Sequence, residues 1–363
     1  MLDFSQLMIL LEKNKSFLLD QMDDELSNAG KLWQQLCADE LLQKTLQETA
    51  SSLLTPKWSE NICSYHELCN DVTAYNILAL DGSQIYPDRH QQTSCALINV
   101  GGVFLSYGEQ VSSFERFSEP FLFSAQYREN HEVSVDGIDA HRNELELKKS
   151  LEYAISYRRK FKKDFVVFFD GALIFWHLVD KPRLQEYYLP RYCAILQKFY
   201  DERIPLIGFI SLPKSKDLIN LIRMLLKIQN SSDSISMISD ADLLFKQLKR
   251  YERTVLFKTQ VSLCVVYPSE MKPYFFYCHV GDEVVRVELP AWIAHDEERL
   301  YQVESIIKDQ CMKGGGYPIA LAEAHEAAVV KYSDQKMFFN LVQQISQQKN
   351  LSKKLQKKRQ PLA

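Results

Sequence analysis

The sequence lacks the long apolar run that a membrane-spanning helix requires, because nowhere in the chain do roughly 18 apolar residues follow one another. Near the amino terminus there is an acidic residue, Asp3, and no basic leader, so we expect no signal peptide. The chain also has little net charge, −4 at pH 7, and thus no overall basic field that would indicate a nucleic-acid partner. We therefore expect no membrane association, and any contact with nucleic acid must come from a local basic patch.

The cysteines lack a metal-binding spacing. Eight of them are scattered along the chain without a C-x-x-C pair, which argues against a zinc site. We expect them to be reduced thiols in a protein of the cytoplasm. The 363 residues are 46% hydrophobic and 25% charged, which is typical of a globular protein with a substantial core.

Two short apolar segments each end in Asp-Gly. Residues 77–80 run into Asp81, and residues 165–169 run into Asp170. A short apolar run bounded by a turn signal is typical of a strand buried on both faces. A single Asp-Gly would be interpreted as an ordinary turn. Two such strand ends can bring two carboxylates to one edge of a sheet, and this arrangement suits a divalent cation.

A helix over residues 139–159 is predicted between these two strands. Its apolar face is marked by Leu147, Leu151, Ala154 and Ile155. At about 100° per residue, Glu144 falls on the edge of that face, whereas Glu146 and Glu152 point away from it. Glu144 is therefore the acid that we expect to face the core. The alternative is that Glu144 is only an acidic residue near the positive end of the helix dipole.

The remaining elements indicate an α/β fold. Residues 1–70 read as helices that cover the sheet or form a dimer or partner surface. Apolar runs over residues 93–100 and 103–107, separated by two glycines, predict a hairpin. A helix over 183–200 and a strand over 206–210 then complete a mixed sheet flanked by helices. Residues 231–290, with strand-like runs over 254–267 and 274–288, read as an insertion in, or an extension of, the same sheet.

Two further segments carry candidate functional residues. Lys214 and Lys216 follow the strand over 206–210 and stand at the start of a helix, so they either hold a phosphate or form a solvated loop. The segment is not a Walker loop, because it lacks the glycines that such a loop requires. Three glycines precede Tyr317 and a small-residue helix with His325. This histidine is either a satisfied core residue or an imidazole brought against the carboxylate edge.

These residues together match the needs of a two-metal phosphodiester hydrolase. Carboxylates from Asp81, Asp170 and a helix glutamate hold Mg²⁺ or Mn²⁺, and the imidazole of His325 shifts the preference towards Mn²⁺. Asp81 is the natural bridging ligand. The basic tail over residues 341–363 is either a frayed helix end or a disordered arm, which contacts a phosphate backbone or is merely solvated.

Five motifs in order resemble the NurA nuclease family between residues 75 and 332. They are L-A-L-D-G-S-Q around Asp81, R-x-E-x-E at Arg142 to Glu146, V-V-F-F-D-G-A-L around Asp170, G-F-I-S-x-x-K-S-K at Gly208 to Lys216, and G-Y-P-x-x-L-x-x-A-H at Gly316 to His325. No single motif is specific, but five in order are. Ala172 departs from the serine that the family often has at this position.

The resemblance implies a ribonuclease-H-like nuclease domain over residues 71–340 that cuts single-stranded DNA and duplex ends with 5′-to-3′ polarity. It implies Mn²⁺ as the cofactor, with Mg²⁺ as a substitute. It also implies a homodimer that docks on a hexameric HerA-type ATPase, in DNA-end resection and repair or in anti-phage defence.

The site residues follow from the same motifs. Asp81, Asp170 and His325 look like the family's metal and catalytic residues, and Tyr317 looks like its active-site tyrosine. Glu144 and Glu146 both fit the R-x-E-x-E motif, so the choice between them stays open. Lys214, Lys216 and Arg142 are the candidate DNA contacts. A catalytically silent dimeric adaptor for a ring ATPase and an RNA-directed nuclease are the alternatives.

Overall fold

The computed structural model describes residues 2–69, 71–87, 95–108, 113–123, 134–161, 165–231 and 235–358. The chain forms two compact units. Unit 1 comprises Met1–Val72, Gly171–Ile174 and Pro205–Ile319, and unit 2 comprises Thr73–Asp170, Phe175–Ile204 and Ala320–Ala363. Each unit therefore combines separate stretches of sequence. The boundaries at residues 70 and 340 that the sequence suggested stay predictions.

Unit 1 contains a sheet of short strands. β10 pairs antiparallel with β6 and with β9, β7 pairs with β9 and β1, and β8 pairs with β9. The strands are β1 (His66–Glu67), β6 (Leu206–Ile210), β7 (Glu252–Arg253), β8 (Phe257–Lys258), β9 (Pro273–His279) and β10 (Val284–Pro290). The segment that follows residue 250 thus extends the sheet that contains β6.

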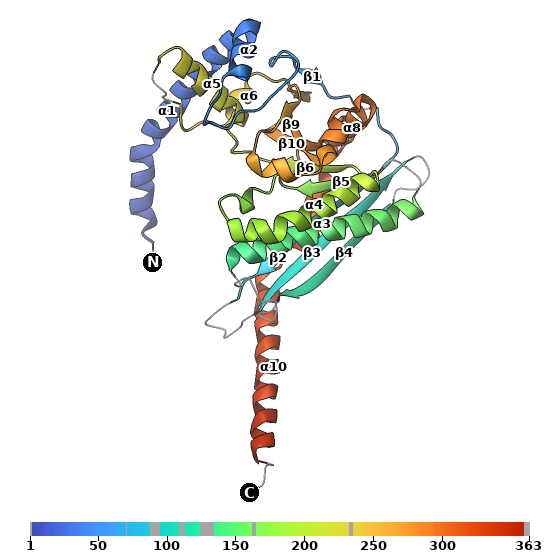
Figure 1. The fold of residues 1–363 in the computed structure, drawn as a ribbon. Coiled ribbons are helices and arrows are strands. Elements are labelled where there is room, and N and C mark those ends of the chain that lie inside the picture. Colours follow the sequence, from blue (N-terminus) through green and yellow to red (C-terminus); the bar gives the residue numbers. More distant parts are fainter. Residues whose placement is uncertain are drawn as a thin grey trace. The chain divides into compact units, whose positions relative to one another are not determined.

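The helices of unit 1 are α1 (Phe4–Ala38), α2 (Glu40–Glu48), α5 (Asp217–Ile228), α6 (Asp240–Phe245), α7 (Ala291–Ala294) and α8 (Glu297–Lys313). An apolar cluster is buried between α1, α2, α5 and α6 and the strands β8, β9 and β10. Figure 1 shows α1, α2, α5 and α6 in one group. Trp33 and Leu36 of α1 pack in a buried cluster with Ile222 of α5, because α5 is apolar on most of its circumference. The second half of α1 therefore covers a core.

One prediction about the cysteines is wrong. Cys37, at the end of α1, forms a disulfide with Cys63, and their Cα atoms are 5.4 Å apart. The sequence does not reveal this pair, because the two cysteines meet only after the chain between them folds back through α2. The other six cysteines form no disulfide, as expected: Cys69, Cys95, Cys193, Cys264, Cys278 and Cys311.

The described residues of unit 2 form strands in the order β5-β2-β3-β4. β2 pairs parallel with β5 and antiparallel with β3, and β3 pairs antiparallel with β4. The strands are β2 (Tyr75–Ile85), β3 (Ala96–Tyr107), β4 (Ser113–Phe123) and β5 (Phe165–Asp170). The helices are α3 (Val135–Lys160), α4 (Pro182–Asp201), α9 (Ile319–Ala328) and α10 (Tyr332–Lys358), with a short 3-10 helix, η2 (Trp176–Leu178).

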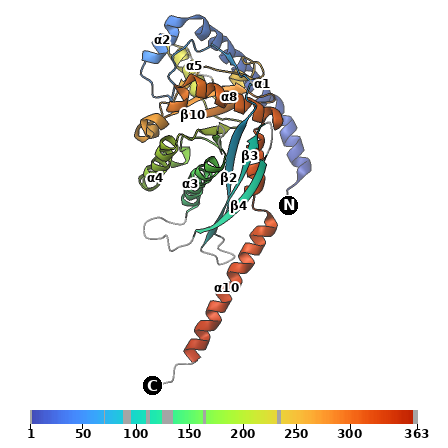
Figure 2. The ribbon, with the colours of Figure 1, turned by 90° about the vertical axis from the view of Figure 1, so that its right-hand side faces the viewer.

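Helix α3 covers one face of these strands. It contacts β2, β3 and β5 and lies beside α4 (Figure 2). The tail forms helix α10 as far as Lys358, and Figure 2 shows this helix extending away from the strands of its unit. The last five residues of the basic tail, 359–363, lie outside the described part of the chain.

Two strand predictions are wrong. The pair Gly101-Gly102 is not a hairpin turn, because β3 runs through both residues and the third strand is β4. A Cβ atom on Gly101 would collide with the backbone of Ala328, so this glycine permits close packing instead of a turn. The strand predicted over 254–267 is mostly irregular and includes a short 3-10 helix, η3 (Ser262–Val266).

No helix in the described ranges is both long enough and apolar enough to cross a membrane.

Candidate metal-binding site

Two aspartates stand side by side at the end of the parallel pair β2 and β5. The register pairs Leu80 with Phe169, so the next residues are Asp81 on β2 and Asp170 on β5. β5 ends at Asp170, as predicted, whereas β2 continues to Ile85 because it still pairs with β3. The Asp-Gly of β2 is therefore part of a strand and not a turn.

The alternation of a strand explains why glycine follows Asp81. Successive residues of a strand point to opposite faces of the sheet. A Cβ atom on Gly82 would collide with Glu146 Oε1 and would lie 2.8 Å from Arg142 Cγ, both on α3. Glycine at this position lets α3 approach the strand closely. Asp81 points to the other face, where His325 of α9 is its neighbour.

His325 reaches Asp81 from helix α9. Its Nδ1 atom lies 2.9 Å from Asp81 Oδ2, and 59% of its side chain is exposed, so it is not a core histidine. The end of α9 is tied to the strands, because the carbonyl oxygen of Ala328 accepts hydrogen bonds from Ser83 Oγ and Asn99 Nδ2. This attachment fixes the imidazole beside the aspartate.

Glu146 is the buried carboxylate of the cluster. Burial raises its pKa to about 8, and the nearby charges of Asp81, Asp170 and Asp139 act in the same direction, whereas Arg142 opposes the shift. Arg142 Nε lies 3.1 Å from Glu146 Oε1. The geometry of this ion pair does not satisfy a hydrogen bond, so Glu146 Oε1 is a buried acceptor without a hydrogen-bond donor.

Glu144 faces a different set of neighbours on the same helix. Its Oε1 atom accepts a hydrogen bond of 2.6 Å from Arg191 Nε of α4, and its Oε2 atom lies 3.5 Å from His141 Nδ1. Burial would raise the pKa of Glu144, but the contacts with His141 and Arg191 outweigh it and lower the pKa. Glu144 thus contacts Arg191 of α4 and His141 of its own helix, and not the aspartates.

The predicted orientation of Glu146 is wrong. Glu146 is buried as fully as Glu144, although the sequence predicted that it points away from the core. The prediction centred the buried face on apolar residues, but Ser150 and Tyr157 of α3 are also buried, and Ile155 is only half-buried. The buried face is therefore rotated towards Glu146, and the two glutamates lie on its opposite edges.

A polar network beside Glu146 was not predicted. Gln84 Oε1 accepts a hydrogen bond from Arg142 Nη1 at 2.9 Å, and Gln84 Nε2 donates to Tyr86 Oη at 2.7 Å and to Asp139 Oδ1 at 3.2 Å. Tyr86 Oη also donates to Asp139 Oδ1 at 2.6 Å. The sequence carried a signal for it, since Gln84 ends the D-G-S-Q motif and Asp139 stands one helical turn before Arg142.

Three other candidate residues belong to unit 1: Tyr317, Lys214 and Lys216. Tyr317 packs edge-on against Phe209, with ring centroids 5.6 Å apart. Lys214 is exposed, whereas Lys216 is half-buried and its Nζ atom donates to the carbonyl of Ser236. Glu152 of unit 2 is exposed and forms an ion pair of 3.1 Å with Lys149, so it lies outside the carboxylate cluster.

The chemistry of the cluster fits a divalent cation. As placed, no three histidine, cysteine, aspartate or glutamate side chains in the described residues form a ready-made cage for a metal ion. However, Asp81, Asp170 and Glu146 concentrate negative charge around one another, and Glu146 Oε1 has no donor. A cation would satisfy both conditions, because carboxylate oxygens are the ligands that Mg²⁺ and Mn²⁺ prefer.

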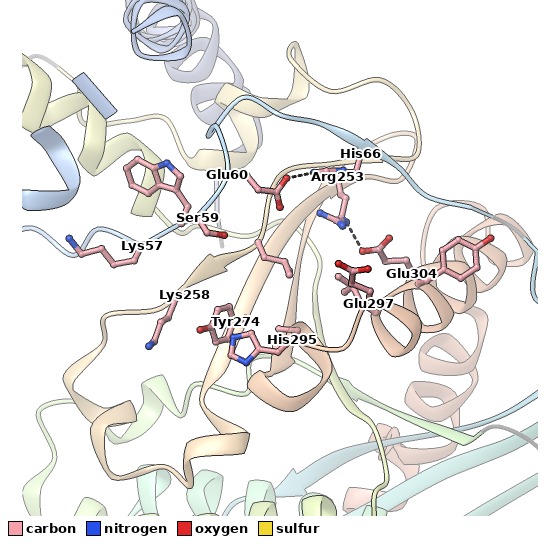
Figure 3. Close-up of a pocket in the computed structure, with 15 residues that line it drawn as sticks. Lys57, Ser59, Glu60, His66, Arg253, Lys258, Tyr274, His295, Glu297 and Glu304 are labelled. Carbon is pink, nitrogen blue, oxygen red and sulfur yellow. Dashed lines mark hydrogen bonds and ion pairs between the residues drawn. The ribbon is translucent and has the colours of Figure 1, made fainter. Parts of the chain in front are cut away.

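A separate pocket of about 750 Å³ lies in unit 1, lined by side chains of mixed charge (Figure 3). Arg253 Nε donates to Glu304 Oε1 at 2.5 Å, and His66 Nε2 lies 3.1 Å from Glu60 Oε2. Lys258 and His295 add further basic groups. None of the residues singled out from the sequence lines this pocket, so it is not the candidate active site.

The site defines a class of protein: an α/β protein with a carboxylate cluster, suited to a divalent cation, at the end of a parallel strand pair. The profile of the NurA domain matches residues 75–330, which is more than half of the chain. The chain belongs to the NurA family, as the motifs indicated.

Solved structures of this family are similar over nearly the whole chain. "Crystal structure of NurA with manganese" is 12% identical, covers 90% of this chain and 96% of its own, and gives a TM-score of 0.45. "Crystal structure of NurA bound to dAMP and manganese" is 12% identical, with coverages of 89% and 93% and a TM-score of 0.41. A search of curated proteins finds no match.

Proposed function

We propose that this chain is a metal-dependent DNA nuclease that hydrolyses phosphodiester bonds. The observation that carries the proposal is the cluster of Asp81, Asp170 and Glu146, with His325 hydrogen-bonded to Asp81, in a chain of the NurA family. Mn²⁺ is the proposed cofactor, with Mg²⁺ as a substitute, because the donor set combines carboxylates with an imidazole.

The proposed chemistry is hydrolysis with two metal ions. Bound divalent cations would lower the pKa of the attacking water and stabilise the leaving oxygen. Asp81 is the proposed bridging ligand, since it adjoins Asp170 in the sheet register and contacts His325. Asp170 and His325 complete the ligand set from two different elements. Tyr317 is the proposed active-site tyrosine.

We assign the helix carboxylate to Glu146 and not to Glu144. Glu146 is electrostatically coupled to Asp81 and Asp170, whereas Glu144 is neutralised by Arg191. Each glutamate faces an arginine and leaves one buried oxygen without a donor, Glu144 Oε2 and Glu146 Oε1. The assignment therefore rests on the charges of the two strand-end aspartates, which act on Glu146.

The wider setting is proposed from family membership. A ribonuclease-H-like core, action on single-stranded DNA and on duplex ends with 5′-to-3′ polarity, a homodimer, and docking on a hexameric HerA-type ATPase belong to this proposal. Such a nuclease would act in the cytoplasm, in DNA-end resection and repair or in anti-phage defence. Lys214 and Lys216 are the proposed DNA contacts of unit 1.

The test is cleavage of single-stranded DNA by the purified protein with Mn²⁺, alone and with its ATPase partner. We expect cleavage by the wild-type protein and none by Asp81→Ala or Asp170→Ala, with thermal unfolding of both variants unchanged or shifted upward in the absence of metal. Intact DNA under both conditions, together with no Mn²⁺ binding by calorimetry, would contradict the proposal and favour a silent adaptor. Matched RNA substrates test the preference for DNA.

The DNA contact of Lys214 has its own test. We expect Lys214→Ala to weaken binding of single-stranded DNA and to reduce the dependence of the affinity on salt, because a phosphate contact releases counterions. Mn²⁺ affinity should stay unchanged. An unaltered binding curve across salt concentrations would remove Lys214 from the DNA-binding surface.

A further inference from the structure

Arg142 stands between Glu146 and the end of strand β2. Its Nε atom lies 3.1 Å from Glu146 Oε1, and its Nη1 atom donates a hydrogen bond of 2.9 Å to Gln84 Oε1. Its aliphatic carbons lie over Gly82, where a Cβ atom would come within 2.8 Å of Arg142 Cγ. The guanidinium is therefore held by a strand residue on one side and faces a glutamate of its own helix on the other.

Gln84 is fixed in turn by two neighbours. Its Nε2 atom donates to Tyr86 Oη at 2.7 Å and to Asp139 Oδ1 at 3.2 Å, so its amide oxygen is directed at Arg142. Tyr86 Oη donates to the same carboxylate oxygen of Asp139 at 2.6 Å. The amide cannot rotate without losing these contacts. The orientation of Arg142 is thus determined by residues that do not themselves touch the aspartates of the cluster.

Glu146 needs such a support. Asp81 and Asp170 repel its carboxylate, and no hydrogen-bond donor among the described residues holds Glu146 Oε1 in place. A neighbouring cation opposes the effect of these two charges and attracts the carboxylate to the place where it lies. Arg142 is the basic residue that contacts it.

We propose that Gln84 and Arg142 are positioning residues that orient the carboxylate of Glu146 towards the cluster of Asp81 and Asp170 for metal binding. This inference rests on the proposed nuclease function. It replaces the prediction that Arg142 is a DNA contact, because two of its three guanidinium nitrogens are directed at protein groups. Partners of metal ligands that act in this way commonly change metal affinity about 10- to 100-fold when they are mutated.

The test separates geometry from charge. Arg142→Lys keeps the positive charge but lacks the planar guanidinium group that contacts Gln84 and Glu146 at the same time. Gln84→Ala removes the hydrogen bond that orients Arg142 and changes no charge. Arg191→Lys is the matched control, because Arg191 pairs with Glu144 on the same helix. Mn²⁺ binding to the full chain without DNA is measured by calorimetry, and thermal unfolding confirms that each variant is folded.

We expect Arg142→Lys and Gln84→Ala each to weaken Mn²⁺ binding about 10- to 100-fold, and Arg191→Lys to bind Mn²⁺ like the wild type. The double variant should bind Mn²⁺ about as tightly as the single variant with the lower affinity, since both residues act through the same carboxylate. DNA affinity without metal and its salt dependence should be unchanged in Gln84→Ala and Arg142→Lys.

Three results would overturn the inference. The first is wild-type Mn²⁺ affinity in both Arg142→Lys and Gln84→Ala. The second is an equal loss in Arg191→Lys, which would indicate a general effect of disturbing α3. The third is a loss of DNA affinity in Arg142→Lys with Mn²⁺ affinity intact, as expected of an arginine that contacts a phosphate through two nitrogens. A wild-type protein that binds no Mn²⁺ would overturn the proposed function itself, and this inference with it.

Discussion

The two edges of helix α3 present the same residue types to different neighbours. On the edge beside α4, Glu144 accepts a hydrogen bond from Arg191, and its pKa is lowered by contacts that outweigh burial. On the edge beside β2, Glu146 faces Arg142, but burial and the charges of two strand-end aspartates raise its pKa to about 8. Both carboxylates are buried and both have an arginine, yet one is stabilised as an anion and the other is not.

The difference teaches that a pairing arginine does not by itself decide what a glutamate does. Among the described residues, Glu144 contacts one arginine and one histidine and no competing carboxylate. At Glu146 the positive charge of Arg142 opposes the negative charges of Asp81, Asp170 and Asp139. An excess of negative charge at a buried site is unfavourable without a cation, so the β2 edge is suited to a metal and the α4 edge to holding two helices together.

The largest expected effect is on catalysis. Glu146→Gln keeps the size of the side chain and removes its charge, and we expect it to reduce cleavage of single-stranded DNA by about a thousandfold or more, as for loss of a principal electrostatic group. Glu144→Gln should retain activity within about threefold, because it removes no carboxylate from the cluster. A cleavage assay with Mn²⁺ measures both. If Glu144→Gln were the inactive variant, the assignment of the two edges would be reversed.

Gly82 tests how closely the β2 edge is packed. In Gly82→Ala the new methyl group would collide with Glu146 Oε1 and crowd Arg142, so we expect a loss of activity of about 10- to 100-fold with the fold retained. Gly30→Ala in α1 is the control, because nothing lies within 4 Å of a Cβ atom there. It should leave cleavage unchanged and stabilise the helix by about 1 kcal/mol. Full activity in Gly82→Ala would show that Glu146 can be displaced without consequence.

Much of this site follows from local sequence. The strand ending at Asp170, helix α4 and strand β6 were predicted within one residue, because each is a strong apolar or periodic run bounded by turn or proline signals. The placement of Asp81 and Asp170 directly after the paired residues Leu80 and Phe169 also followed from two such runs that end in the same dipeptide. These features depend on neighbours close in the chain.

The errors share another cause. Gly101 is a glycine because the backbone of Ala328 packs on it, and the orientation of Glu146 depends on Ser150 and Tyr157 being buried. The disulfide of Cys37 likewise depends on a loop that folds back. Each feature is fixed by contacts between segments that are distant in sequence or by polar residues buried in packing. Apolar periodicity does not record either kind of contact.

The pH dependence of stability should distinguish the two edges without any substrate. The pKa of Glu146 is raised above its unfolded value, so its contribution is fully present below about pH 4.5 and is lost as the pH rises through about 8. We expect Glu146→Gln to stabilise the metal-free protein by roughly 3 kcal/mol near pH 8 and by little near pH 5. Urea unfolding at the two pH values measures this. An equal effect at both would mean that Glu146 is ionised without penalty.

The smallest effect is expected at the other edge and has the opposite sign. The pKa of Glu144 is lowered, so its contribution is present above its unfolded pKa and is lost as the pH falls through the folded one. A double-mutant cycle of Glu144→Gln and Arg191→Gln should give a coupling of about 1 kcal/mol near pH 7, modest because the Arg191 side chain is 45% exposed. The coupling should shrink as the pH falls towards 4. A coupling that instead grew under acid conditions would mean that Arg191 stabilises α3 through contacts other than the Glu144 carboxylate.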